Sequence, residues 1–283
     1  MILFLYYNSI CNPIPNTISY SSTWRYIMLI KDESAAIKMI EDFSLNAWPS
    51  HQIQYYDGWL LRFSYFYTHR TNSVEQLGHS VLPIDEKIDF CEDAYHHWGT
   101  PCIFKITPLL DNDFEKRLIN RGYLTQHITE VMLLDFNKYR RSDPPVFVLL
   151  EHTINSRWIN GLFALKGTTS AIHRQIVPSM YRAIPKDTLA ASIQNDQGQI
   201  VAIGLGILDR SYMGIYAIHV HPHYRGRGYA RAVCSTLLNA GKDMSLEGAY
   251  LQVVYGNTIA KKLYTSLGFQ DFYQYWFRVK ELF

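Results

Sequence analysis

A glycine-rich segment with three arginines is the feature of this sequence that points most directly to chemistry. It runs from His221 to Ala230 (HPHYRGRGYA), after an apolar stretch and before an amphipathic one. Gly226 and Gly228 allow the backbone to turn tightly and approach a ligand, and the free N–H groups of the following helix then point at one place. With the helix dipole these groups favour an anion such as a pyrophosphate. The positive charges beside them are Arg225, Arg227 and Arg231.

The segment matches neither of the two common nucleotide-binding patterns. The phosphate loop G-x-x-x-x-G-K-[ST] is absent, and so is the dinucleotide fingerprint G-x-G-x-x-G. Short glycine patterns also occur in plain strand-to-helix turns, so an ordinary turn with solvated arginines is the alternative for R-G-R-G taken alone.

A second segment, NTIAKKLYTSLGF from Asn257 to Phe269, carries a phenol that could act as a proton donor. Asn257 can cap a helix and Gly268 can end it. Tyr264 is then either a general acid at a site or a tyrosine packed on the helix's core face.

The two segments together resemble the GNAT acyltransferase superfamily. The acyl-CoA loop of that superfamily, [RQ]-x-x-G-x-[GA], is filled by Arg225, Gly228 and Ala230. Its motif N-x-x-A-x-x-L-Y-x-x-x-G-F is matched by Asn257, Ala260, Leu263, Tyr264, Gly268 and Phe269. The similarity covers residues 150–283. Residues 56–62 and 70–73 are similar to the amino-terminal part of bacterial two-part GNAT proteins.

The resemblance implies an N-acetyltransferase (an acyltransferase of the EC 2.3.1 class) that uses acetyl-CoA as co-substrate, with direct attack of a primary amine in a ternary complex and no metal. The residues it implies at the acyl-CoA are Ile218, His219, Val220, Arg225, Gly226, Arg227, Gly228, Tyr229, Ala230, Asn257, Ala260 and Tyr264. Tyr264 would protonate the departing thiolate, and an amide N–H near Val220 would stabilise the oxyanion.

The base that takes the amine proton is less clearly marked. His219 is the candidate, because an imidazole has a suitable pKa. His219, His221 and His223 alternate, but no carboxylate or Cys accompanies them, so we predict no metal site. An acidic residue that many bacterial relatives carry near the position of Ala217 is absent.

Candidate acceptor contacts come from the first half: Asp57, Trp59, Arg62, Arg70 and Asn72. The alternative is a half-solvated sheet face with Trp59 in the core. The expected acceptor is a small-molecule amine or an amino-acid-like compound; polyamines, antibiotics and protein amino groups stay open. A second hypothesis is a non-catalytic acyl-CoA sensor or interaction module. Nucleic-acid binding is disfavoured because the net charge is only +2.

The elements that must position these residues follow from hydrophobic periodicity. In the second half, strands over 189–193, 199–208 and 212–220 precede a helix after Gly228, a strand over 250–254, a helix over 257–267 and a strand over 272–279. The order is therefore β-β-β-α-β-α-β. With this order the resemblance implies an α/β (α+β) GNAT fold, with a mixed, mainly antiparallel sheet flanked by helices and an N-terminal GNAT-like half. A loop is expected up to Lys186.

The first half is predicted to contain helices over 34–45, from about Pro83 and over 113–120, with strands after Gly58, near 67–74 and over 102–106 and 130–136. Residues 117–123 (RLINRGY) resemble residues 263–269 (LYTSLGF), which suggests a shared plan. We therefore predict a possible extension over 1–27, a degenerate GNAT-like domain over 28–142 and a catalytic domain over 146–283.

Composition limits the remaining possibilities. The 283 residues are 48% hydrophobic and 18% charged, which excludes a disordered chain. Four scattered cysteines without a C-x-x-C pair predict neither a zinc site nor a disulfide framework. A cytoplasmic protein without membrane or nucleic-acid partners, monomeric or homodimeric, is the expectation.

Overall fold

The computed structural model describes residues 32–281, so the possible extension over 1–27 lies outside the described residues. The elements of the first half are α1 (Glu33–Ala47), β1 (Gln52–Tyr56), β2 (Trp59–Phe63), β3 (Glu75–Gln76), α2 (Ile84–His97), β4 (Cys102–Ile106), α3 (Asn112–Asn120) and β5 (Leu124–Asp135). Those of the second are β6 (Leu149–Glu151), α4 (Ser156–Lys166), α5 (Ala171–Arg182), β7 (Thr188–Gln194), β8 (Ile200–Asp209), β9 (Tyr212–Val220), α6 (Tyr229–Asp243), β10 (Gly248–Val254), α7 (Thr258–Ser266) and β11 (Gln270–Lys280). The predicted fold class and the order of the second half are confirmed.

The main sheet has eight strands in the order β4-β11-β5-β10-β9-β8-β7-β6. Its neighbours are antiparallel except for β9 and β10, which run parallel. A smaller antiparallel sheet contains β1, β2 and β3, and a parallel bridge between Val74 and Phe104 brings it to β4.

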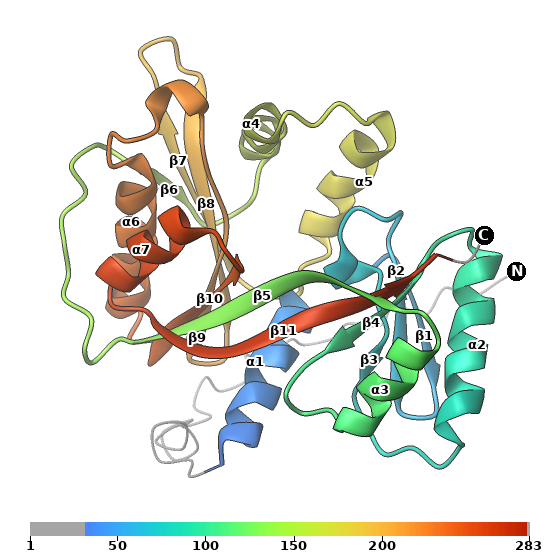
Figure 1. The fold of residues 1–283 in the computed structure, drawn as a ribbon. Helices are drawn as coiled ribbons and strands as arrows, with labels where there is room; N and C mark the ends of the chain where they lie inside the picture. The colour runs from blue at the N-terminus through green and yellow to red at the C-terminus, as the bar shows by residue number, and fades with distance from the viewer. Residues whose placement is uncertain (1–31, 282–283) are drawn as a thin grey trace, which may run out of the picture.

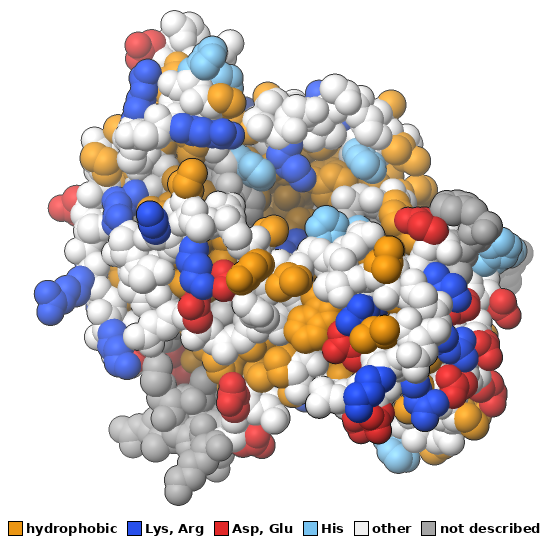
Figure 2. Space-filling view, in the orientation of Figure 1, with side chains coloured by type: hydrophobic (Ala, Val, Ile, Leu, Met, Phe, Trp, Pro, Cys, Tyr) orange, Lys and Arg blue, Asp and Glu red, His pale blue; other side chains and the backbone are white. Residues whose placement is uncertain are grey.

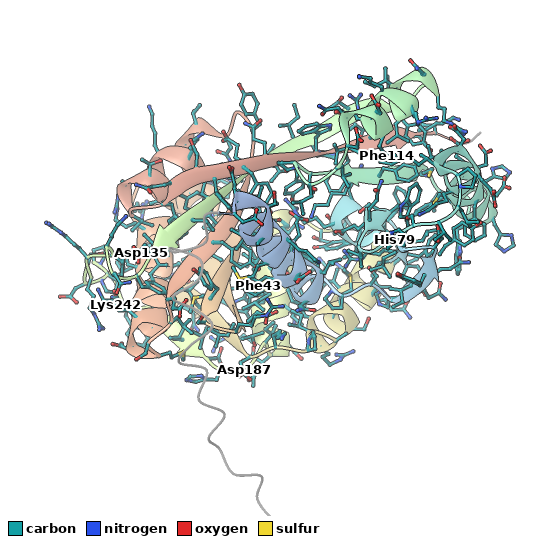
Figure 3. All side chains as sticks on the ribbon, turned by 90° about the horizontal axis from the view of Figure 1, so that it is seen from below. Phe43, His79, Phe114, Asp135, Asp187 and Lys242 are labelled. Atoms are coloured by element: carbon teal, nitrogen blue, oxygen red, sulfur yellow. The ribbon has the colours of Figure 1, made fainter. Side chains whose placement is uncertain are left out.

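The last strands of the two halves are exchanged within this sheet. β5, from the first half, lies between β10 and β11, and β11, from the second half, lies between β5 and β4. Both strands run along the length of the molecule in Figure 1. Seen from below, α1 with Phe43 lies between the side that carries Phe114 and the side that carries Asp135 and Lys242 (Figure 3). The two similar segments, 117–123 and 263–269, lead into these two neighbouring strands.

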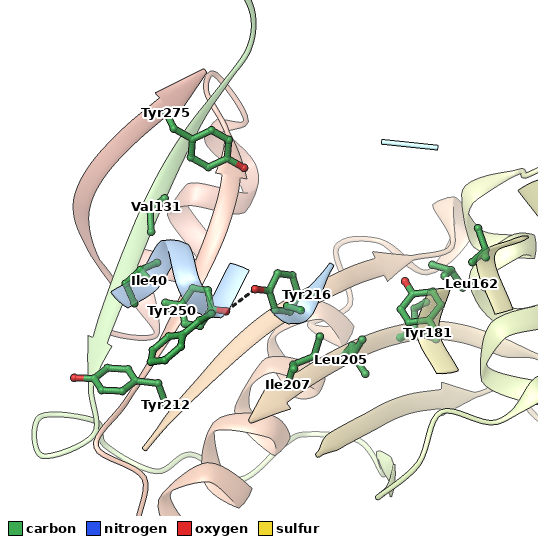
Figure 4. Packing of buried hydrophobic residues seen from close by; sticks show 14 of the residues in the cluster. Ile40, Val131, Leu162, Tyr181, Leu205, Ile207, Tyr212, Tyr216, Tyr250 and Tyr275 are labelled. Carbon is green, nitrogen blue, oxygen red and sulfur yellow. Dashed lines mark hydrogen bonds between the residues drawn. The ribbon is translucent and has the colours of Figure 1, made fainter. Parts of the chain in front are cut away.

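Buried side chains cover both faces of the second half of the sheet. On one face α1, α4 and α5 pack against Tyr216, Tyr250 and Tyr275, and Figure 4 shows the hydrogen bond of 2.6 Å that joins the hydroxyls of Tyr216 and Tyr250. On the other face α6 and α7 supply a cluster that includes Leu237 and Tyr264. The sheet therefore separates these two clusters, and a site that reaches both faces needs a gap between strands.

Two sequence predictions are wrong in detail. The strand expected near residues 67–74 is a short 3₁₀ helix, His69–Thr71, because the Asn72 side chain accepts hydrogen bonds from the backbone N–H groups of Ser64 (2.6 Å) and Phe66 (3.2 Å) and holds a turn. The expected loop before Lys186 contains helix α5, which encloses Pro178. A proline is unfavourable inside a helix, and here the burial of Val177 and Tyr181 offsets that cost.

None of the helices within residues 32–281 combines the length and the apolar character that a membrane span requires.

Candidate functional site

The two parallel strands of the main sheet separate part of the way along their length. β9 and β10 are paired only from Tyr212–Gly248 to Ile215–Leu251, although β9 continues to Val220 and β10 to Val254. On its other side β9 shifts register against β8 in the segment that contains Ala217, whose φ is +51°. Such a bulge adds residues to one strand and bends it away from its neighbour. The bend leaves a V-shaped gap between β9 and β10.

A cavity of about 920 Å³ occupies this gap. It reaches both faces of the sheet, because its walls include Tyr264 from the α6 and α7 side and Trp48 and Tyr216 from the α1 side. Figure 2 shows this face of the molecule hollowed between the β7–β8 part and helices α4 and α5. The floor of the hollow is hydrophobic, and His, Lys and Arg side chains stand around it.

Every residue that the sequence implied at the acyl-CoA lines this cavity except Arg227. Arg227 lies over the ring of Tyr224, with its guanidinium carbon 5.1 Å from the ring centroid. Residues 218–220 come from the unpaired end of β9, residues 225–230 from the loop and the start of α6, and Asn257, Ala260 and Tyr264 from α7 and its cap. Segments far apart in the sequence thus meet at one place.

The glycine-rich loop has the geometry of an anion site. Gly226 and Gly228 have φ values of +74° and +78°, which residues with a side chain adopt only under strain. Gly228 is the N-cap of α6, and no side chain among the described residues caps this helix. The first N–H groups of α6 are therefore available to a ligand, with the helix dipole behind them. Arg225 is tied to the cavity wall, because its Nε donates to the Val220 carbonyl at 3.3 Å.

Tyr264 lies where the cavity meets the core. Helix α7 begins at a capped turn, in which the Asn257 side chain accepts from the Ala260 N–H at 3.2 Å. The Tyr264 side chain is 9% exposed and packs edge-on against Phe269. Burial, and secondarily Cys234, raises the pKa of the phenol above its ordinary value. The hydroxyl is protonated at neutral pH, as any tyrosine is, and its raised pKa makes it a weaker acid than an exposed tyrosine.

His219 lies in the same cavity, but its pKa does not suit the expected role. Burial, the charge of Lys166 and the charge of Arg225 lower the pKa of the imidazole to about 4. The ring is neutral at pH 7 and can accept a proton, yet it is a weak base. The expectation of a suitable imidazole pKa at this position is thus corrected.

Of the five acceptor candidates only Arg70 lines the cavity. Asp57 accepts from the N–H groups of Val81 and Leu82 and faces Lys87 at 3.2 Å. Trp59 is 2% exposed, as the alternative interpretation predicted, and Asn72 holds the turn described above. Arg62 is buried and donates from Nη1 to Glu75 (3.0 Å). These four residues have structural contacts and lie outside the cavity.

Sequence reasoning missed several residues of the cavity wall, among them Trp48, Tyr216 and Gln252. Gln252 had a readable signal, because it is a polar residue within the apolar stretch 250–254 that forms β10. Trp48 had no such signal, since it follows the first described helix and is distant in sequence from every other part of the site.

The cavity wall is positively charged. It includes Arg70, Arg225 and Arg231, and no Asp or Glu among the described residues lines it. Within residues 32–281 no group of three or more His, Cys, Asp or Glu side chains could hold a metal ion. The arrangement can bind an elongated anionic ligand in the gap and place a phenol and strand-end N–H groups beside it.

Comparisons with known proteins identify the family of the chain. Residues 34–277 match the family described as "Probable histone acetyltransferase Rv0428c C-terminal". The chain is 25% identical over 247 residues to the "Uncharacterized N-acetyltransferase YobR" of Bacillus subtilis, covering 86% of this chain and 98% of that protein.

Solved structures show the same fold. A GCN5-related N-acetyltransferase from Kribbella flavida has a TM-score of 0.64 at 12% identity, with 87% of this chain and 95% of that one covered. A "Tandem GNAT protein from the clavulanic acid biosynthesis pathway" has a TM-score of 0.60 at 11% identity, with 75% of each chain covered.

Proposed function

Because the chain belongs to the GNAT superfamily, and within it to the family described as "Probable histone acetyltransferase Rv0428c C-terminal", we propose that it transfers an acetyl group from acetyl-CoA to a primary amine. The observation that carries this proposal is the continuity of the loop anion site with the gap between β9 and β10. With the pyrophosphate of CoA bound at Arg225–Ala230, the gap between β9 and β10 can hold the pantetheine arm and the thioester. The cavity reaches both faces of the sheet, so an amine can approach the thioester from the side opposite to CoA.

The end of β9 supplies the group that would polarise the thioester. The N–H of His221 donates to the Val201 carbonyl on β8 at 2.8 Å. Because successive N–H groups of an extended strand point in opposite directions, the N–H of Val220 faces the gap. There it can donate to the oxyanion that develops during attack.

Tyr264 would donate the proton that the departing thiolate takes, and the positive charge of the cleft would favour the neutral amine. The amine nitrogen attacks the carbonyl carbon, the C–N bond forms, and the electron pair of the C–S bond goes to sulfur, which takes the proton of Tyr264. The proton lost from nitrogen goes to water and the phenol is reprotonated. The positive charges of Arg70, Arg225 and Lys166 oppose an ammonium in the cleft and favour the neutral, nucleophilic amine.

Calorimetric titration with acetyl-CoA and with CoA tests the proposal. We expect saturable heat for both ligands and release of free CoA thiol when an acceptor amine is added. Absence of heat at millimolar ligand would overturn the acyl-CoA assignment.

A second candidate, a non-catalytic acyl-CoA sensor, is supported by one observation. No carboxylate among the described residues lines the cleft, and the only imidazole there has a pKa of about 4. A sensor would bind acetyl-CoA with the same heat but release no thiol with any amine. Thiol release across a panel of amines therefore separates the two candidates.

A further inference from the structure

One arginine of the cleft, Arg70, lies apart from the glycine-rich loop. Arg225 and Arg231 lie at the loop and the start of α6, on the pyrophosphate side. Arg70 comes instead from the first half and lies at the closed end of the gap. Its Nε donates to Gln252 Oε1 at 2.8 Å, and Gln252 directly follows Leu251, the last residue of β10 that pairs with β9.

The side chain of Arg70 is held in one orientation. Its Nε also lies 2.8 Å from the Tyr275 hydroxyl, and that hydroxyl donates to Gln252 Oε1 at 3.0 Å. Gln252 is fixed in turn by a 2.6 Å hydrogen bond from its Nε2 to Ser44 Oγ. These contacts use only Nε of the guanidinium. Within residues 32–281 no hydrogen bond or ion pair engages either Nη group, although the half-buried side chain lines the cavity.

Arg62 joins Arg70 to the aromatic wall of the cleft. The Nη1 of Arg62 donates to the Arg70 carbonyl at 2.5 Å, and its Nη2 donates to the Trp48 carbonyl. Trp48 packs edge-on against Tyr216, and its buried indole N–H finds no acceptor among the described residues. The acceptor end of the cleft thus offers an aromatic surface and a fixed guanidinium with two unused donor groups.

The charged side chains in the cleft wall are Arg70, Arg225 and Arg231, with no Asp or Glu among the described lining residues, so the charge of the acceptor matters for binding. A polyamine or a lysine-rich peptide keeps positive charge after one amine is neutral, and no carboxylate among the described wall residues faces it. A guanidinium with both Nη groups unused pairs best with a carboxylate or a phosphate, which its fork matches in geometry.

We propose that the acceptor is a primary amine that carries its own anionic group, a carboxylate or a phosphate, and that Arg70 binds this group through its Nη atoms. The inference rests on the proposed acetyl transfer and names its substrate class. Trp48 packs against the apolar part of the acceptor, and the amine points toward the thioester at the open end of the gap.

Matched pairs of amines test the charge preference. The pairs are alanine with alaninamide and 2-aminoethyl phosphate with ethanolamine, and spermidine and a lysine-rich peptide are added as cations. Release of CoA thiol is measured with purified full-length protein. We expect kcat/KM at least tenfold higher for the anionic member of one pair, and the two pairs show whether carboxylate or phosphate is preferred. Equal rates within both pairs, or faster turnover of the cations, would overturn this inference and leave acetyl transfer standing.

The variant Arg70→Gln distinguishes recognition from a structural role. We expect the ratio of kcat/KM between the anionic and neutral members to fall toward one, while the Kd for acetyl-CoA stays within twofold. Arg70→Lys, which keeps the charge but not the fork, should retain part of the preference. Arg225→Gln is the matched control, because it should weaken acetyl-CoA binding and leave the ratio unchanged. An unchanged ratio in Arg70→Gln would remove Arg70 from recognition. Lack of thiol release from every amine by the wild-type protein would overturn acetyl transfer itself, and with it this inference.

Discussion

Each half of the molecule contains a parallel contact between strand segments. The contact in the second half borders an open cavity, whereas the one in the first half borders buried ion pairs. In the second half β9 and β10 separate around an open cavity of about 920 Å³ with arginines in its wall. In the first half the segment at Val74 meets β4, with hydrogen bonds from Val74 N to Ile103 O (2.7 Å) and from Lys105 N to Val74 O (3.1 Å). Beside this contact the charged groups are buried and paired. The Lys105 ammonium contacts Glu41 and lies 3.8 Å from Glu75, which also accepts from Arg62 at 3.0 Å.

The segments that connect these strands to the next helix also differ in whether they can bind an anion. After β9 the chain passes through Gly226 and Gly228 to an uncapped helix start. After β3 it passes through residues 77–83 and enters α2 at Pro83, without a pair of left-handed glycines. Helix α2 also lacks a side-chain cap, but Asp85 and Glu86 in its first turn disfavour an anion there. Similar strand arrangements therefore serve different ends: one keeps its cations and N–H groups available to a ligand, and the other uses its charges to join α1, β2, β3 and β4 within the first half.

The largest effect should come from breaking the ion pairs of the first half. Lys105→Met leaves the buried Glu41 without its cation, so we expect the free energy of unfolding in urea to fall by about 3–5 kcal/mol. The double variant Lys105→Met, Glu41→Gln should recover part of this loss, because the unpaired charge is gone. A loss below about 1 kcal/mol in the single variant would mean that these pairs do not stabilise the fold.

The next largest effect should fall on the loop of the second half. Gly228→Val forces a branched residue into φ +78° and disturbs the N–H groups at the start of α6, so we expect the Kd for acetyl-CoA to rise at least about 100-fold in calorimetry. Gly122→Val is the matched control. That residue has φ +86° and equally open space in the first half, and its variant should bind acetyl-CoA normally. Equal binding by both variants would contradict the loop assignment.

The phenol at the cleft should affect turnover and leave binding intact. We expect Tyr264→Phe to lower kcat by about 10- to 100-fold, because the thiolate loses its proton donor, with the Kd for acetyl-CoA within twofold. Tyr123→Phe, which removes a phenol that donates to Glu92 at 3.0 Å in the first half, is the control and should leave kcat unchanged. Unaltered kcat in Tyr264→Phe would assign Tyr264 to the core alone.

The smallest effects concern the histidine of the cleft. Because the pKa of His219 is about 4, we expect His219→Asn to lower kcat less than about tenfold and to leave the pH profile between 6 and 8 unchanged. A loss above 100-fold, or an inflection near pH 6.5 that the variant abolishes, would restore His219 as the base.

The same pKa predicts a small dependence of stability on pH. The folded pKa of His219 lies below its ordinary value of 6.5, so between pH 6.5 and 4 the unfolded chain binds a proton that the folded protein does not. Stability should therefore fall as the pH drops through this window, on the order of 1 kcal/mol for a partly exposed ring. His69, whose pKa is also lowered to about 4 by burial, adds to the loss. Urea unfolding at pH 7 and 4.5 measures the total, and it should be smaller in His219→Asn.

Local signals made residues 189–279 of the second half predictable, although helix α5 was expected to be a loop. The glycines of the 225–230 loop, the cap at Asn257 and the spacing of Tyr264 lie within short segments, and the helix and strand periods around them are clear. Local signals could not predict which acceptor candidates of the first half line the cavity. Arg62 and Arg70 are eight residues apart and of one type, yet one is buried among carbonyls and Glu75, and the other lines the cleft. Their difference depends on contacts with Trp48, Gln252 and Tyr275.

The sequence by itself determined the anion loop, the phenol-bearing helix and the strand order between them, because each depends on neighbours within a few residues: glycine φ angles, a capping side chain and hydrophobic period. Only the tertiary structure decided that β5 and β11 exchange places between the halves and that Arg70 meets Gln252, 182 residues later, at the closed end of the gap. The pKa of His219 was decided there too. Burial and the charges of Lys166 and Arg225 set that pKa, and long-range pairing sets the strand order and the Arg70 contact; none of these is encoded in the spacing of residues along the chain.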